Sequence, residues 1–475
     1  MSQPSFPFLF SPLRVGRATV RNRIVVTAHG KGYALDGLPN ARMAAYYAER
    51  ARGGVGLVVT EATVVHPTGR HRPGVVLGYE PASVPGFRRI AQVVHEHGAL
   101  VVGQLFHPGL VAAGQLSLLP VWSSSRQLGG GSEYTHALDR DEIRELIRGF
   151  ATTAAHMRQA GYDGVEVHAG HGYLLQQFIS PLFNRRSDEY GGSLEKRLRL
   201  CVEVVDAVRA AIGPQSVVGL RLSAHEFADG GLTPDDAAEI AQRLEATGQL
   251  DYISVSAGNR ASYWAGIPPM DLPPAVFTPF AQTVKQRIRL PVVACGRIND
   301  PAVAEEVLAA GRADLVGMTR ALIADPELPR KAREGRVEDI RACIGCNQGC
   351  VGMVHMRPPI TQARAGRRRR AGGHGGGAGR RRARARGGAL GAAGPAGWPG
   401  APGRAGAPPR RPGRGDALAG GHAGQARRAR KAGPRSDGRA GAGLRARGHR
   451  RGHRRAARPP ARARRRPAVR RGLLG

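Results

Sequence analysis

Residues 217–256 read VVGLRLSAHEFADGGLTPDDAAEIAQRLEATGQLDYISVS, which is one strand–helix–strand unit. The run Val217–Ser223 is short, apolar and rich in β-branched residues, as expected of a buried strand. Pro234–Ala246 is amphipathic and predicts a helix, and Tyr252–Ser256 predicts the next strand. Two strands joined by a helix are expected to lie parallel in one sheet.

The same alternation recurs along the chain. Further strands are predicted at Ile24–Ala28, Val55–Thr60, Ala99–Leu105, Gly164–His168, Val292–Cys295 and Leu315–Gly317. The other amphipathic segments are Ser83–His97, Arg140–Ala160, Leu194–Ile212, Pro301–Ala309 and Pro326–Glu334. Eight alternations predict an α/β fold, a (β/α)8 TIM barrel over residues 1–340. A doubly wound open sheet is the competing fold, but Thr27-Ala28-His29-Gly30 does not supply the glycine-rich turn that it needs after its first strand.

Residues 363–475 differ in kind, because they consist almost wholly of Arg, Ala, Gly and Pro. Nearly all of the formal net charge of +35 falls in this tail, so the rest of the chain has the ordinary balance of a soluble enzyme. So little apolar surface predicts disorder. GC-rich codons encode these four residue types, and we interpret the tail as the product of a shifted reading frame. Non-specific binding of nucleic acid through the tail is an alternative function, with no specific recognition expected.

Other features bound the class of protein. No run of about 18 apolar residues appears, which predicts no membrane span. Residues 1–13 lack the basic and apolar regions of a secretion signal, so a cytoplasmic location is expected. Three of the five cysteines (Cys343, Cys346 and Cys350) lie within eight residues. In a reducing compartment this spacing indicates metal or cluster chemistry rather than disulfides.

The carboxyl ends of the strands are where a TIM barrel carries its chemistry. The residues there are Thr27, His29, Glu61, Ala62, Gln104, His107, His168, His171, Arg221, Ser256, Gly296, Arg297, Thr319 and Arg320. Many are polar, and since buried polar groups need partners, they predict a polar ligand at this rim. Gly296 would let backbone N–H groups approach a phosphate, and Arg297 and Arg320 would add forked hydrogen bonds. These residues follow strands 7 and 8, the usual phosphate site of the fold.

Long blocks of sequence carry a further signal. They are LFSPL at 9–13, RNRI at 21–24, YYAERARGGVGL at 46–57, QLFH at 104–107, HAGHGYL at 168–174, FNRRSDEYGGS at 183–193 and CIGCNQGC at 343–350. In this order they resemble the Old Yellow Enzyme group of NADH:flavin oxidoreductases, in the branch of 2,4-dienoyl-CoA reductase and trimethylamine dehydrogenase. The resemblance covers roughly residues 8–355.

The resemblance implies an FMN cofactor, reduced by NAD(P)H, with its phosphate at Gly296, Arg297 and Arg320. It also implies that Gln104 and Arg221 contact the flavin ring, with Thr27 and Ala62 beside it. Thr319 is expected among the cofactor-binding residues as well. A guanidinium near N1 and C2=O would stabilise the negative charge of a reduced ring. Alternatively, Arg221 could be a buried ion-pair partner of Glu226 or Glu166.

The catalytic signal is His168-x-x-His171-x-Tyr173. In the family, the pair matching His168 and His171 binds a substrate carbonyl or anion, and Tyr173 matches a proton donor. Hydride arriving at one alkene carbon builds enolate charge on the oxygen, which two imidazoles stabilise while a phenol protonates the other carbon. A zinc site is the alternative, but no third ligand is evident. The segment Ser256–Arg260 lacks a histidine that the dienoyl reductase branch supplies, which argues against dienoyl-CoA as the substrate.

Cys343, Cys346 and Cys350 resemble the first three thiolate ligands of the family's [4Fe–4S] cluster. Gln362 stands where the fourth cysteine is expected. The segment 341–362 is therefore expected to form an incomplete iron–sulfur site.

The leading hypothesis is an FMN-dependent oxidoreductase that transfers hydride from NAD(P)H via FMN to the activated C=C of an enone or enoyl-type substrate. The alternative is an amine or alcohol dehydrogenase of the trimethylamine dehydrogenase type, since the aromatic pair Tyr263-Trp264 could cage a cation. The partner is expected to be a small unsaturated carbonyl or amine compound. A homo-oligomer is left open.

Overall fold

The computed structural model describes residues 6–130 and 133–352, in which eight parallel strands close into a barrel. These strands are β3 (Ile24–Val26), β4 (Leu57–Val64), β6 (Leu100–Phe106), β9 (Gly164–Ala169), β10 (Val217–Ser223), β11 (Tyr252–Ser256), β12 (Val292–Ala294) and β13 (Leu315–Gly317). They pair in chain order, and β13 pairs with β3 to complete the ring. The predicted (β/α)8 barrel is confirmed, and the competing open sheet is wrong.

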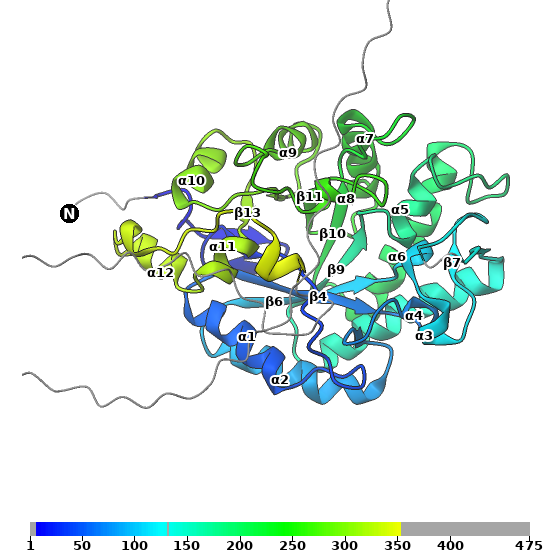
Figure 1. The fold of residues 1–475 in the computed structure, drawn as a ribbon, viewed down its shortest axis with the longest axis horizontal. Coiled ribbons are helices and arrows are strands. Elements are labelled where there is room, and N and C mark those ends of the chain that lie inside the picture. The colour runs from blue at the N-terminus through cyan, green and yellow to red at the C-terminus, as the bar shows by residue number, and fades with distance from the viewer. Residues whose placement is uncertain (1–5, 131–132, 353–475) are drawn as a thin grey trace, which may run out of the picture. The chain divides into compact units, whose positions relative to one another are not determined.

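Helices surround the strands, as Figure 1 shows. The longer ones are α1 (Ala41–Arg52), α2 (Val84–His95), α4 (Arg140–Gln159), α6 (Leu194–Ile212), α7 (Pro234–Glu245), α9 (Thr278–Lys285) and α10 (Pro301–Ala309). Two of them begin at capping boxes, α4 at Asp139 and α7 at Thr233, which explains why the predicted and observed starts agree. Short elements decorate the loops: α3 (Gly114–Ser117), α5 (Leu174–Ile179), α8 (Tyr263–Gly266), α11 (Thr319–Ala324), α12 (Leu328–Arg333), β5 (Val76–Leu77), β7 (Trp122–Ser123) and β8 (His136–Ala137).

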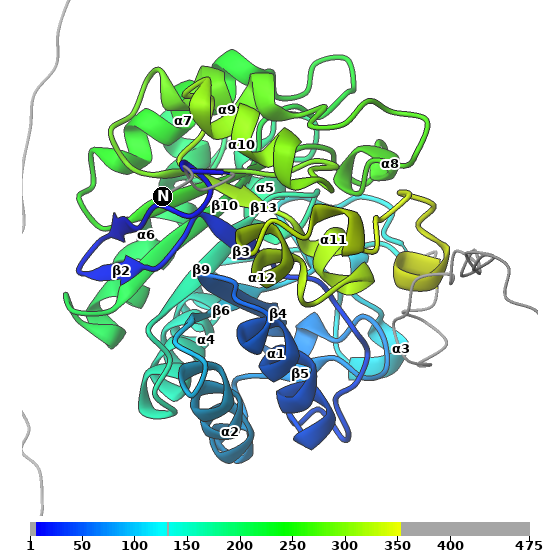
Figure 2. The same cartoon turned by 90° about the vertical axis from the view of Figure 1, so that its left-hand side faces the viewer.

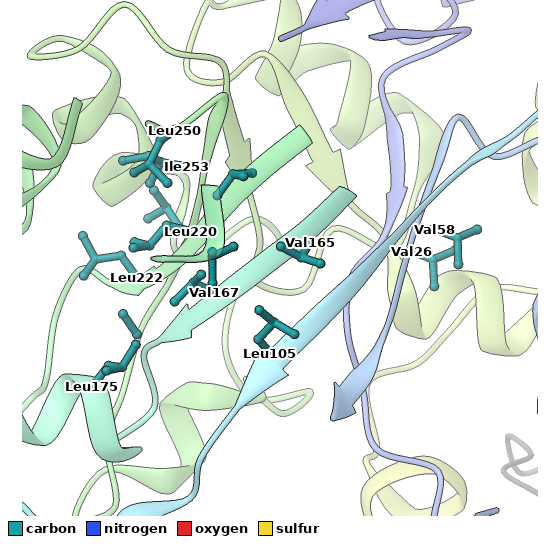
Figure 3. Close-up of a cluster of buried hydrophobic side chains, with 14 of the residues drawn as sticks. Val26, Val58, Leu105, Val165, Val167, Leu175, Leu220, Leu222, Leu250 and Ile253 are labelled. Atoms are coloured by element: carbon teal, nitrogen blue, oxygen red, sulfur yellow. The ribbon is translucent and has the colours of Figure 1, made fainter. Parts of the chain in front are cut away.

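Side chains alternate between the two faces of each barrel strand. In β9, Val165 and Val167 join the large apolar cluster that lies between strands and helices (Figure 3). Glu166 and His168 point to the other face, into the barrel, and are buried there. The same alternation places further polar residues inside, namely Gln104 in β6, Arg221 in β10 and Ser256 in β11. The two-residue alternation thus places apolar residues toward the helices and polar site residues inside the barrel.

An antiparallel hairpin, β1 (Leu13–Val15) with β2 (Ala18–Val20), packs against the amino ends of the strands. Val15 and Val20 join an interior apolar cluster with residues from the starts of β4, β6, β10, β11, β12 and β13. Figure 2 shows this hairpin beside the barrel. The hairpin was not predicted from the sequence, and it leaves the carboxyl ends of the strands as the rim that carries the site.

β4 continues past Thr60, where the predicted strand ends, and its register against β6 shifts between Thr60 and Thr63. At this irregularity Glu61 forms a buried salt bridge, with its Oε1 3.0 Å from Lys31 Nζ. Both side chains are buried, 0% and 2% exposed. Lys31 Nζ also donates to the Tyr47 hydroxyl at 2.6 Å. The pair ties the loop after β3 to β4 beside the rim.

Replacing Lys31 with methionine is expected to lower the free energy of unfolding by about 3–5 kcal/mol, because the Glu61 carboxylate is left buried without its cation. Denaturant unfolding of the full chain measures the change. The matched control is Arg243→Met, which breaks the exposed α7 pair with Glu239 and is expected to cost below about 1 kcal/mol. A Lys31→Met variant as stable as this control would contradict the prediction.

Among the described residues, every helix is too short or too polar to cross a membrane. The predicted cluster segment 341–362 lies within the described residues only as far as residue 352. The basic tail, 363–475, lies outside them.

Candidate active site

A cavity of about 650 Å³ opens at the carboxyl ends of the barrel strands. Its wall includes all eleven residues that the sequence predicts for catalysis and cofactor binding. They are Thr27, Ala62, Gln104, His168, His171, Tyr173, Arg221, Gly296, Arg297, Thr319 and Arg320. They come from different strand ends, and the closure of the barrel brings them together.

One end of the cavity is formed by the loops after β12 and β13. Gly296 and Arg297 have φ of +117° and +57°, a left-handed turn that suits glycine at the first position. Arg297 donates to the carbonyl of Leu272, but its Nε is buried and no described residue accepts a hydrogen bond from it. Arg320 donates to the carbonyl of Pro268 at 2.7 Å. This end therefore offers two guanidinium groups and an unused donor, which fits a phosphate.

Polar groups from neighbouring strands form the floor. Gln104 Nε2 donates to Glu166 Oε1 at 2.7 Å, and Arg221 Nη1 donates to Ser254 Oγ at 3.0 Å. Burial raises the pKa of Glu166, and the nearby Arg221 guanidinium opposes that shift. Across the floor, Thr27 and Thr319 join β3 to the start of α11, with their hydroxyl oxygens 2.8 Å apart.

The alternative of an Arg221 ion pair with Glu226 does not hold. The Glu226 carboxylate accepts from Gln176, Ser180 and the Leu232 amide instead. Of the two acids considered, Glu166 is the one whose charge acts on Arg221. The Arg221 guanidinium is 6% exposed and lines the cavity.

The two histidines form a contacting pair. Gly170 N–H donates to His168 Nδ1 at 3.2 Å, so the neutral ring carries its proton on Nε2. That Nε2 lies 3.3 Å from His171 Nδ1, and His171 Nε2 lies 2.7 Å from Ser256 Oγ. As the structure stands, His168 Nε2 donates to His171 Nδ1, so His171 carries its own proton on Nε2, facing Ser256 Oγ. If the Ser256 hydroxyl donates to Nε2 when a ligand oxygen binds, the His171 proton lies on Nδ1 instead. The two imidazoles then present N–H groups to one place, as an oxyanion site requires.

Burial keeps both imidazoles neutral. It lowers the pKa of His168 well below the ordinary value and that of His171 to about 3, with the positive charge of Arg221 adding to both shifts. Tyr173 follows the pair, with its ring 5.1 Å from that of His168 and 4.6 Å from that of Phe106. Burial and the neighbouring Tyr263 raise the pKa of Tyr173 to about 12. The phenol therefore keeps its proton at neutral pH and can donate it.

Comparison with known proteins decides the family, because the model of the NADH:flavin oxidoreductase / NADH oxidase family matches residues 8–339. The chain belongs to this family. The resemblance predicted from the sequence is confirmed.

The metal reductase of Desulforamulus reducens is 39% identical to this chain over 366 residues, which are 76% of this chain and 54% of that protein. The NADH oxidase of Thermoanaerobacter brockii is 38% identical over 351 residues, 73% of this chain and 54% of that protein. A solved complex of 2-naphthoyl-CoA reductase with 2-naphthoyl-CoA superposes with a TM-score of 0.72 at 31% identity, over 75% of this chain and 56% of that one. The chain spans about half the length of the curated relatives it matches.

Two of the predicted strand-end residues, Glu61 and His107, do not line the cavity. Glu61 faces Lys31, and His107 Nε2 lies 2.9 Å from Thr68 Oγ1. Of the predicted aromatic pair, Tyr263 lines the cavity, whereas Trp264 is 48% exposed and packs on Phe227 with ring centroids 5.0 Å apart. The pair therefore does not form a cage around one position.

Sequence reasoning missed functional candidates around the same wall. Glu166 is one, and the inward face of β9 could have revealed it, two residues before His168. Arg72 and Asn259 are two others, since both line the cavity and each has a buried nitrogen with no hydrogen-bond partner among the described residues. They lie in loops, where no period distinguishes a site residue from a solvated one.

The three predicted cluster ligands do not form a metal-binding group in the described part of this chain. Cys343 and Cys350 are buried and Cys346 is partly exposed. Cys350 alone of the three lines the cavity. Gln362, at the position of the fourth ligand, lies outside the described residues. Because the thiols present do not supply a four-ligand set, we derive no chemistry from a cluster.

Proposed function

We propose that this protein binds FMN in the cavity and transfers hydride from NAD(P)H to the activated C=C of a small unsaturated carbonyl compound. The observation that carries the proposal is the arrangement of His168, His171 and Tyr173. Two neutral imidazoles that contact each other and a protonated phenol lie at the rim of a cavity whose other end suits a phosphate. Bound FMN would supply the hydride once NAD(P)H has reduced it.

The chain's own residues would hold the cofactor and the substrate. Gly296, Arg297 and Arg320 would bind the phosphate, with Thr319 beside them. The ring would lie against the floor formed by Gln104 and Arg221, bordered by Thr27 and Ala62. The buried Arg221 guanidinium would stabilise negative charge that develops on the ring edge nearest to it.

At the substrate, the imidazole pair would hold the carbonyl oxygen and stabilise its growing negative charge. Tyr173 would give its proton to the alkene carbon that does not receive hydride. Together, one hydride and one proton saturate the C=C bond, and a proton from solvent restores the phenol.

The charge of the cavity favours this function over amine oxidation. Five arginines line the wall, and no aspartate or glutamate does so within residues 6–130 and 133–352. The neutral His168 and His171 add no charge to this wall. Glu166, below the floor, acts on Arg221, and among the described residues no acid on the wall offsets the other arginines. A cationic amine would enter a positive field, whereas a developing enolate is stabilised by it.

The test is a rapid-reaction experiment on FMN-loaded protein. NAD(P)H is expected to bleach the flavin absorbance, and 2-cyclohexenone added without oxygen is expected to restore it with formation of cyclohexanone. Methylated amines are expected to leave the oxidised flavin unchanged. Flavin bleaching by an amine, with no reoxidation by the enone, would overturn the proposal.

The phosphate end yields a separate prediction. Arg297→Ala is expected to raise the dissociation constant of FMN about 10- to 100-fold, because it removes hydrogen bonds from a charged group. Quenching of FMN fluorescence on titration measures the constant. Arg287→Ala, which removes an exposed arginine after α9, is the matched control and is expected to bind FMN as wild type does. Equal affinity in both variants would place the phosphate elsewhere.

A further inference from the structure

The cavity has a second group of donors, beside Tyr173 and apart from the loops of Arg297 and Arg320. It consists of Arg72, which follows β4 in the chain, and of Asn259 and Arg260, which follow β11. The backbone of Arg260 packs on Gly172, so close that a Cβ at Gly172 would lie 2.8 Å from Arg260 N. Both guanidinium groups act electrostatically on the Tyr173 phenol. This group therefore lies at the proposed substrate end.

Asn259 has a fixed amide orientation. Its side chain is 2% exposed, and its Oδ1 accepts hydrogen bonds from the backbone N–H groups of Ala261 and Ser262 at 2.8 and 3.2 Å. The Ser262 hydroxyl donates its one proton to the Glu226 carbonyl at 2.6 Å, so the two backbone N–H groups fix this orientation. The Nδ2 is consequently a donor, and it is buried with no hydrogen-bond partner within residues 6–130 and 133–352. A buried amide N–H group without a partner calls for an acceptor in the cavity.

Arg72 presents a second unused donor. His71 donates from Nδ1 to the carbonyl of Gly69, and its Nε2 accepts from Arg72 Nε at 3.3 Å. This contact orients the guanidinium, and the Nη2 packs over Gly30, where a Cβ would lie 2.1 Å away. Arg72 Nη1 is buried and has no hydrogen-bond partner in the part of the chain that the structure describes.

The charges on the cavity wall indicate which kind of hydrogen-bond acceptor would bind there. A phosphate at Arg297 and Arg320 and a reduced ring at Arg221 would account for three of the five arginines. Arg72 and Arg260 remain, and no carboxylate on the cavity wall offsets them among the described residues. The buried Nη1 of Arg72 is costly to leave without an acceptor, and Arg260 is exposed at the cavity wall. A ligand carboxylate, with two acceptor oxygens, matches both donors.

We propose that Arg72, Asn259 and Arg260 bind a carboxylate on the substrate. The acceptor is then an unsaturated carbonyl compound with an anionic group, whose ketone oxygen lies at His168 and His171. This inference rests on the proposed function and adds the substrate class to it. A phosphate of NADPH is a second source of the same negative charge, and the experiment includes an arm for it.

The test compares one ligand in two charge states. A 4-oxo-2-enoate has a ketone at one end of its C=C bond and a carboxylate at the other, and its methyl ester differs only in charge. Calorimetric titration into oxidised FMN-loaded protein, without reductant, gives both dissociation constants with no turnover. The acid is expected to bind at least about tenfold more tightly than the ester, as expected for a hydrogen-bonded charge pair.

Two variants probe the residues directly. Arg72→Leu is expected to remove most of the preference for the acid. Asn259→Asp keeps the acceptor oxygen that holds the loop but replaces the NH₂ group with an oxygen, and it is expected to make the acid bind no better than the ester. Arg89→Leu, an exposed arginine of α2, is the matched control and is expected to keep the wild-type ratio. If Arg72→Leu does not fold, Asn259→Asp decides the result.

The outcomes separate the inference from the function beneath it. Equal binding of acid and ester by a protein that reduces simple enones would overturn the inference and leave the proposed function standing. Preferred binding of the acid without any enone reduction would support the anion site and contradict the proposed function. If Arg72→Leu instead lowers only the rate of flavin reduction by NADPH, and not by NADH, the positive charge serves the nucleotide and the carboxylate proposal is wrong.

Discussion

Replacement of His168 by alanine is expected to slow the transfer of hydride from the reduced flavin to a bound enone about 10²- to 10³-fold. This is the usual cost of removing one oxyanion donor. The Gly170 N–H group fixes the proton of His168 on Nε2, the nitrogen that faces His171. Burial holds the pKa of His168 far below the ordinary value. The imidazole is therefore a neutral hydrogen-bond donor. Its loss leaves the developing oxyanion with one imidazole.

The measurement separates the two half-reactions by stopped flow. Reoxidation of the flavin by 2-cyclohexenone is expected to show the whole effect, while its reduction by NAD(P)H stays within about threefold of wild type, since the lost group acts on the enone oxygen alone. The double variant with His171→Ala is expected to lose less than the product of the single losses, because the rings act as one site. Equal slowing of both half-reactions would show that His168 holds the flavin instead.

The barrel can be predicted from the sequence because side chains along a strand alternate between the two faces of the sheet. Val165 and Val167 must face the helices, and this requirement alone sends Glu166 and His168 inward. Closure of the ring then converts strand ends that are far apart in the chain into neighbours. The strand limits were less certain where tertiary contacts decide, as in β4, which continues through Glu61 because of its register shift and the Lys31 salt bridge.

The parts that could not be predicted depend on loop geometry. Nothing in the motif His168-x-x-His171 shows that Ser256, at the end of β11, contacts the Nε2 of His171. The donor of Asn259 becomes visible only once its other amide atom is seen to be occupied by its own loop. Conversely, the spacing of Cys343, Cys346 and Cys350 suggests a metal site that the described residues do not assemble.

Tyr173→Phe is expected to slow reoxidation of the flavin by an enone about 10²- to 10⁴-fold, the range typical of a lost general acid. The substitution removes only the hydroxyl, and the ring keeps its contacts with Phe106 and His168. Flavin reduction by NAD(P)H is expected to continue at close to the wild-type rate. The wild-type reaction is expected to run more slowly in D₂O than in H₂O, because a proton moves from the phenol in the step that is measured. The variant lacks that transfer and is expected to lose the isotope effect.

The pH profile tests the same assignment without a mutation. The proton donor must stay protonated and the imidazoles must stay neutral. Burial raises the pKa of Tyr173 to about 12 and lowers that of His171 to about 3, so neither group changes its charge between these limits. The rate of reoxidation by an enone is therefore expected to be flat from about pH 5 to pH 10, over which an exposed histidine of pKa about 6.5 would titrate. A step near pH 6.5 would mean that the imidazoles are solvated and charged at low pH, and the neutral donor pair on which the proposed chemistry depends would not exist.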